Sequence, residues 1–116
     1  MSYYATLQEL PGIKPACIPI VRGIIEAAKR KVAKGHAEGY EEELSRFMVE
    51  EDGDIHPEKW YDKWDNDEDW IRVLAPYLRN GYILFRGDDA DWGYVIEDGR
   101  AYHTLTIYQK AAPVDD

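Results

Sequence analysis

The stretch GYILFRGDDADWGYVIEDGRAYHTLTIYQ, residues 81–109, decides the fold class of this protein. Apolar and polar residues alternate along it with a period of two, which is typical of half-buried β-strands. Two loop signals interrupt the alternation: the acidic segment 87–91, and Asp98-Gly99, a dipeptide favoured in type I′ hairpin turns. The stretch therefore predicts a three-stranded antiparallel meander.

The two loops also predict which side chains share a face of the meander. The two-residue turn places Tyr94 opposite His103, and a five-residue acidic loop would pair Arg86 with Trp92. Residues opposite one another point to the same side of the sheet. The face expected to pack against helices carries Tyr82, Leu84, Trp92, Tyr94, Ile96, Ala101, His103, Leu105 and Ile107.

Two segments ahead of the meander are predicted as helices. The first runs from Pro19, a residue favoured in the first helical turn, to Gly35, and its last turns are rich in lysine and arginine. The second spans residues 36–52, where apolar residues recur at helical spacing and glutamates crowd the first turns.

A third helix is predicted over residues 66–79. Pro76 lies too deep in it to be a first-turn residue, so we expect a kink or a restart near Leu74. A further short helical turn, beginning at Pro57, would carry three aromatic residues: Trp60, Tyr61 and Trp64.

Residues 2–8 are aromatic and β-branched and predict a strand that precedes the helices. The sum is a single α+β domain over residues 1–110, with an N-terminal strand, two or three helices, and a three-stranded antiparallel meander packed on the helices. Residues 111–116 are expected to form a flexible acidic tail.

The chain of 116 residues carries a formal net charge of −9, and the negative charge is concentrated in its middle. Residues 38–70 hold fourteen acids against three bases, a net charge of −11. Acidity of this degree argues against direct nucleic-acid binding, because affinity for the phosphate backbone depends on cations. One interpretation of the block is an acidic face directed at a basic partner, and the other is solubility combined with helix-dipole complementarity.

Cysteine usage and hydropathy indicate the compartment. The single cysteine, Cys17, permits no internal disulfide, which suits a reducing environment. The N-terminal residues do not resemble a signal peptide, and no apolar stretch approaches the roughly 20 residues that span a bilayer. The sequence is therefore interpreted as that of a cytoplasmic protein that does not enter a membrane.

The segment WYDKWDNDEDW, residues 60–70, places three of the four tryptophans beside a run of acids. Its second half begins like a calcium-binding loop, but the sixth position is Trp70 where glycine is required, and the twelfth is Pro76 where glutamate is required. We therefore predict no metal, no cofactor and no catalytic residue. An enzyme that works through His103 is kept as a weaker hypothesis.

The leading functional hypothesis is a non-enzymatic acidic protein, an accessory or inhibitory factor that is steered onto a partner protein with a basic surface. The predicted partner-binding residues are Glu41, Glu42, Trp60, Trp64, Asp65, Asp67, Glu68 and Asp69. The alternative is a small-ligand or carbohydrate-binding module that uses the clustered aromatics. Homodimerisation through the second face of the sheet is also open.

Residues 81–99 resemble a hairpin pattern of small uncharacterised proteins of bacteria, phages and mobile elements. In that pattern a strand of the form G-x-I-x-F-x-G is followed by acids, a tryptophan, an alternating strand and a turn glycine. The matching positions are Gly81, Ile83, Phe85, Gly87, Asp88, Asp89, Trp92, Tyr94 and Gly99. The resemblance implies a phage-related or mobile-element origin, and it implies no activity and no catalytic residues.

Overall fold

The computed structural model describes residues 4–88, 90–106 and 109–114, and within them the chain has an α+β fold. The helices are α1 (Ile18–Lys34), α2 (Gly39–Leu44) and α3 (Asp67–Leu74), with 3₁₀ turns η1 (Pro15–Cys17) before α1 and η2 (Ala75–Tyr77) after α3. The strands are β1 (Tyr4–Glu9), β2 (Phe47–Val49), β3 (Ile55–Pro57), β4 (Tyr61–Lys63), β5 (Gly81–Gly87), β6 (Asp91–Glu97), β7 (Arg100–Thr106) and β8 (Gln109–Pro113).

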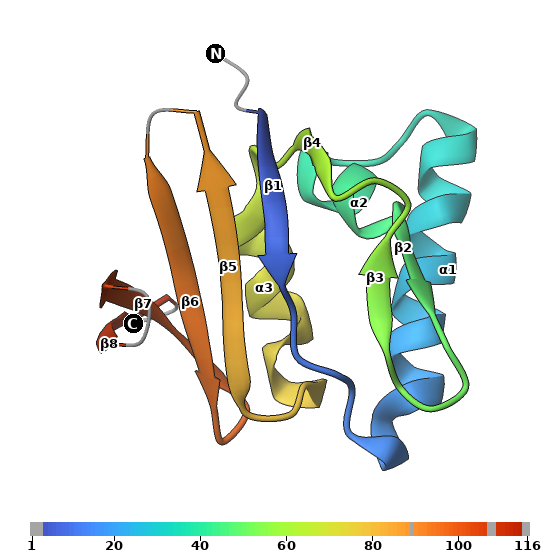
Figure 1. Ribbon diagram of the computed structural model, residues 1–116. Coiled ribbons are helices and arrows are strands. Elements are labelled where there is room, and N and C mark those ends of the chain that lie inside the picture. The colour runs from blue at the N-terminus through green and yellow to red at the C-terminus, as the bar shows by residue number, and fades with distance from the viewer. Residues whose placement is uncertain (1–3, 89, 107–108, 115–116) are drawn as a thin grey trace.

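The described strands form two antiparallel sheets. Six of them make one sheet in the order β4-β1-β5-β6-β7-β8, and β2 and β3 make a separate hairpin. Figure 1 shows α3 behind the larger sheet and α1 beside the β2–β3 hairpin. The predicted meander is present as β5-β6-β7, but it is only part of a larger sheet, because β1 and β4 extend one side of it and β8 extends the other.

The register of β6 and β7 is confirmed. Tyr94 lies opposite His103, and the turn between the strands has Asp98 at φ 52° and Gly99 at φ 81°. Both values lie in the left-handed region that a type I′ turn requires. This local dipeptide therefore determined the pairing of the two strands.

The predicted register of β5 is wrong by one residue. Arg86 lies opposite Asp91 in place of Trp92, so four residues connect the two strands where five were expected. A slip of one residue exchanges the two faces of a strand. Ile83 and Phe85 therefore point into the core, in place of Tyr82 and Leu84, which are only half-buried. The predicted core positions Leu105 and Ile107 lie outside the described side chains.

The helix predicted over residues 36–52 is wrong beyond its first turns. α2 ends at Leu44, and Phe47 opens β2. Both residues are buried, so their helical spacing reflects two elements that face one core. The chain reverses after β2 at Gly53, whose φ of 96° strongly favours glycine, and this turn lets β3 pair back on β2.

The short helical turn predicted from Pro57 is also wrong, because this segment forms β3 and β4. Tyr61 pairs with Thr6 of β1, and the amide of Leu7 donates to the carbonyl of Trp60 across 2.8 Å. The edge of β1 supplies these partners, and no local pattern reveals that edge. The spacing of four residues between Trp60 and Trp64 is therefore not helical.

The break predicted within the third helix is confirmed. α3 ends at Leu74 and continues as the 3₁₀ turn η2, which contains Pro76. A proline in the helix interior removes one hydrogen bond and crowds the preceding turn, which accounts for the change of helix type.

Residues 111–113, which were expected to begin a flexible tail, belong to β8. Val114 is buried, and its amide donates to the carbonyl of Ala101.

The core lies between the larger sheet, α3, α1 and the β2–β3 hairpin. Its centre is an aromatic cluster formed by Phe47, Trp64, Trp70 and Phe85, all at most 1% exposed. Ring centroids of neighbouring members lie 4.9–6.3 Å apart, a spacing at which aromatic pairs attract one another in tilted arrangements. Two of the three tryptophans of residues 60–70 are therefore structural.

Candidate functional site

The eight predicted partner-binding residues are divided by the structure into structural and exposed groups. Trp64 belongs to the aromatic core and cannot anchor a partner. Glu41 is also buried: it accepts a hydrogen bond from the amide of Glu38 and pairs with Lys31 of α1. These two contacts, the amide first, hold the pKa of Glu41 below its usual value. Glu41 therefore closes a capping box and joins α1 to α2.

Asp67 is half-buried where the first turn of α3 meets the inner face of the sheet. Its Oδ2 atom accepts two hydrogen bonds, from Trp92 Nε1 at 2.9 Å and from the Tyr94 hydroxyl at 2.6 Å. Burial raises the pKa of Asp67, and the two donors act against that rise. Beside it, Glu68 lies 3.0 Å from His103, whose ring packs against Tyr94. These contacts join α3 to the sheet.

The Asp67 site predicts a measurable pH dependence. A folded-state pKa above the unfolded value means that Asp67 contributes most to stability when protonated, below its unfolded pKa. That contribution is lost as pH rises through the folded pKa. Asp67→Asn keeps an oxygen that can accept both donors and removes the charge. We therefore expect the stability of the native protein to fall relative to Asp67→Asn between pH 4 and pH 7.

Urea unfolding of both proteins across this pH range measures the difference directly. Asp69→Asn is the control, because Asp69 lies two positions further along α3 and is exposed. If the native protein instead gains stability relative to Asp67→Asn as the pH rises, the two hydrogen bonds, and not burial, dominate the ionisation of Asp67.

Glu43 was not among the predicted residues, yet it is the most deeply buried carboxylate described, at 2% exposed. Its Oε2 accepts from the amide and side chain of Asn66 at 2.8 and 3.0 Å, and its Oε1 accepts from Trp70 Nε1 at 3.0 Å. Burial raises the pKa of Glu43, and these donors oppose the rise. Glu43 thus fastens α2 to the start of α3.

The remaining predicted acids are exposed around this α2–α3 junction. We call them the acidic surface, and its members are Glu42, Asp65, Glu68 and Asp69. Arg72 lies 3.3 Å from Asp69 and 4.0 Å from Glu68, so part of the charge is neutralised within α3. Glu43 joins α2, which carries Glu42, to the segment that carries Asp65, Glu68 and Asp69.

Trp60 is the predicted anchor that the structure leaves accessible. It is 43% exposed and lies immediately before β4, while Asp65 of the acidic surface follows that strand. Its backbone carbonyl accepts from the Leu7 amide and from Trp64 Nε1, so the backbone is held although the side chain is not buried. Two more aromatics are exposed nearby, Tyr4 and Tyr61, whose rings stack at 5.6 Å.

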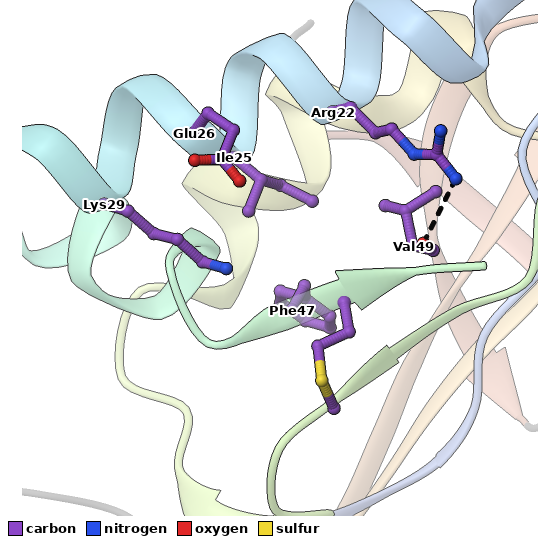
Figure 2. Close-up of a pocket in the computed structure, with 7 residues that line it drawn as sticks. Arg22, Ile25, Glu26, Lys29, Phe47 and Val49 are labelled. Atoms are coloured by element: carbon purple, nitrogen blue, oxygen red, sulfur yellow. Dashed lines mark hydrogen bonds between the residues drawn. The ribbon is translucent and has the colours of Figure 1, made fainter. Parts of the chain in front are cut away.

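A groove of about 300 Å³ lies on another part of the molecule, between α1 and β2 (Figure 2). Its lining residues are Arg22, Ile25, Glu26 and Lys29 of α1, and Phe47, Met48 and Val49 of β2. Ile25 and Phe47 are buried and make an apolar floor. The charged side chains of α1 are exposed beside it. The sequence contains no motif for this groove, because the apolar spacing of residues 36–52 predicts a helix where β2 forms.

The described residues hold no group of three or more His, Cys, Asp or Glu side chains arranged to bind a metal ion. Within the same residues, no helix combines the length and the apolar character needed to cross a membrane. Comparison of the chain with protein-family models, curated proteins and solved structures found no match.

Proposed function

We propose that this chain is a non-enzymatic, cytoplasmic interaction protein, an accessory or inhibitory factor of a phage or mobile element, that binds a partner with a basic surface. The observation that carries the proposal is the acidic surface: four exposed carboxylates on α2 and on the segment 65–69, which Glu43 joins to α2. Opposite charges across an interface accelerate association and select the partner. Trp60 is the matching aromatic anchor, because large rings at interfaces supply much of the binding energy.

The small-ligand or carbohydrate alternative has less support. It relied on a cluster of tryptophans, and Trp64 and Trp70 are in the core. What remains for stacking against a ligand is the exposed set Tyr4, Trp60 and Tyr61. These rings border the β4 edge of the sheet, and none of them lines the α1–β2 groove. A protein surface fits this arrangement better than a small molecule does.

The proposal predicts that removing charge from the acidic surface weakens partner binding. The variant Glu42→Gln/Asp65→Asn/Asp69→Asn removes three exposed charges. Each charge that pairs with a cation of the partner is expected to contribute about 0.2–1 kcal/mol to the free energy of binding. We expect roughly tenfold weaker binding, which corresponds to about 1.4 kcal/mol. The measurement is capture of basic proteins from a bacterial extract on the immobilised native protein and on the variant, with mass spectrometry and a salt series.

The control variant is Glu9→Gln/Glu51→Gln/Asp88→Asn, which removes the same charge from exposed positions elsewhere. The expected partner stays bound to this control, is lost from the acidic-surface variant, and is released as salt screens the charges. Trp60→Ala should also weaken its capture. Equal retention on the native protein and both variants at high salt would contradict the proposal.

A further inference from the structure

Among the residues that the structure describes, no strand pairs with the edge of β2 that lies opposite β3. The amide of Glu58 donates to the carbonyl of Arg46, and the amide of Glu50 donates to the carbonyl of Asp54, so these residues form hydrogen-bonded pairs across the hairpin. In an antiparallel ladder the hydrogen-bonded residues alternate with residues whose backbone groups point the other way. The amides and carbonyls of Phe47 and Val49 are therefore directed away from β3.

This free edge borders the α1–β2 groove. Arg22 Nη2 approaches the carbonyl of Val49 at 3.5 Å, a long contact that Figure 2 shows reaching from α1 across the groove. A hydrogen bond of this length is weak. Phe47 is 0% exposed, so an incoming strand would first have to displace side chains that line the groove. Pairing with Phe47 and Val49 would then satisfy up to four backbone groups and would release the Arg22 guanidinium to another partner.

The charge beside the groove is opposite to that of the chain as a whole. α1 carries five bases and one acid, while the formal net charge of the chain is −9. Arg22 and Lys29 both line the groove, with Glu26 between them. Two cations against one anion beside an apolar floor favour a ligand that has both carboxylates and apolar side chains.

We propose that the α1–β2 groove binds an extended acidic segment of a partner protein, which pairs with the free edge of β2 as an added strand. β2 has three residues and spans about 10 Å, so it pairs with a short segment. Alternate side chains of that segment point to opposite faces. One set packs toward Ile25 and Phe47, while carboxylates reach Arg22 and Lys29.

A second copy of this chain is the less suitable occupant. Two copies that paired through β2 would each carry a formal net charge of −9. A two-fold interface also places the same patch of both copies together, which would oppose Arg22 and Lys29 to their own counterparts. A basic segment would meet the same cations. The charge of the groove therefore selects an acidic strand from another protein.

The experiment uses synthetic heptapeptides in which glutamate alternates with valine, isoleucine, leucine or phenylalanine. Each has a counterpart with lysine in place of glutamate, and two counterparts N-methylated at even or at odd positions. Binding is followed by NMR titration of the isotope-labelled protein. We expect acidic peptides to bind at least tenfold more tightly than lysine peptides, and to shift the amides of Phe47 and Val49. One N-methylation pattern should abolish binding, because it removes the donors that face β2.

Two protein variants locate the charge effect. Arg22→Glu/Lys29→Glu should weaken the acidic peptides at least tenfold, whereas Arg30→Glu/Lys34→Glu, the same change at exposed positions of α1 outside the groove lining, should change binding less than twofold. Three results would overturn the proposal: no acidic peptide binds at millimolar concentration, both N-methylated forms bind as well as the parent, or sedimentation shows a dimer that uses the same amides.

Discussion

Trp64→Ala is expected to lower the free energy of unfolding by about 3–5 kcal/mol, which is the usual cost of removing a large buried aromatic side chain. Trp64 is 1% exposed, and its ring contacts Phe47, Trp70 and Phe85 with centroids 5.7–6.2 Å away. Arg46 also lies over the ring at 5.5 Å. The substitution leaves a cavity at the point where the hairpin, α3 and the sheet meet. The loss is large, because the whole free energy of unfolding of a native protein is only about 5–15 kcal/mol.

The matched control is Trp60→Ala, because the two tryptophans are four residues apart and only one is buried. Trp60 is 43% exposed, so its removal should cost less than about 1 kcal/mol. Urea unfolding followed by far-ultraviolet circular dichroism measures both values. If the two substitutions destabilise the protein equally, the assignment of Trp64 to the core and Trp60 to the surface is wrong.

Glu43→Ala should cost about 3–5 kcal/mol, because three hydrogen-bond donors lose their acceptor. An unpaired buried donor costs about 1–3 kcal/mol, and donors to a charged group lie at the upper end. The carboxylate receives the amide and side chain of Asn66 and the indole of Trp70, all within 3.0 Å. Removing it unfastens α2 from α3 and leaves the indole N–H of Trp70 unpaired beside the aromatic core.

Glu43→Gln separates the charge from the shape of the side chain. A glutamine has one acceptor oxygen, and its NH₂ group must face a donor of Asn66 or Trp70, so we expect about 1–3 kcal/mol of destabilisation. Glu42→Ala is the control: it changes the neighbouring exposed glutamate and should stay within about 0.5 kcal/mol. A cost for Glu43→Ala no greater than that of the control would show that water replaces the carboxylate.

Glu41 and Glu43 show why the sequence could not separate the structural acids of residues 38–70 from the exposed ones. In the sequence they are two members of a run of glutamates beside Glu42. In the fold, Glu41 pairs with Lys31 of α1 and Glu43 with donors that follow β4, while Glu42 faces solvent. Which of three adjacent carboxylates is structural depends on which elements pack on each side of α2.

The sequence by itself determined the elements that local chemistry specifies. Pro19 and Gly35 bracketed α1, which spans Ile18–Lys34, and Asp98-Gly99 determined the pairing of β6 with β7. Pro76 marked the change of helix type after α3. Each of these signals acts within a few residues, through a fixed dihedral angle or a missing amide, so no distant partner is needed to read it.

The tertiary structure alone decided the rest. The short strands β2, β3 and β4 have three residues each and form only where another strand offers a free edge. The loop before β6 is one residue shorter than the sequence suggested, and this reversed the faces of β5. The same packing buried Trp64, exposed Trp60 and opened the α1–β2 groove, because burial depends on which elements meet and not on residue type or spacing.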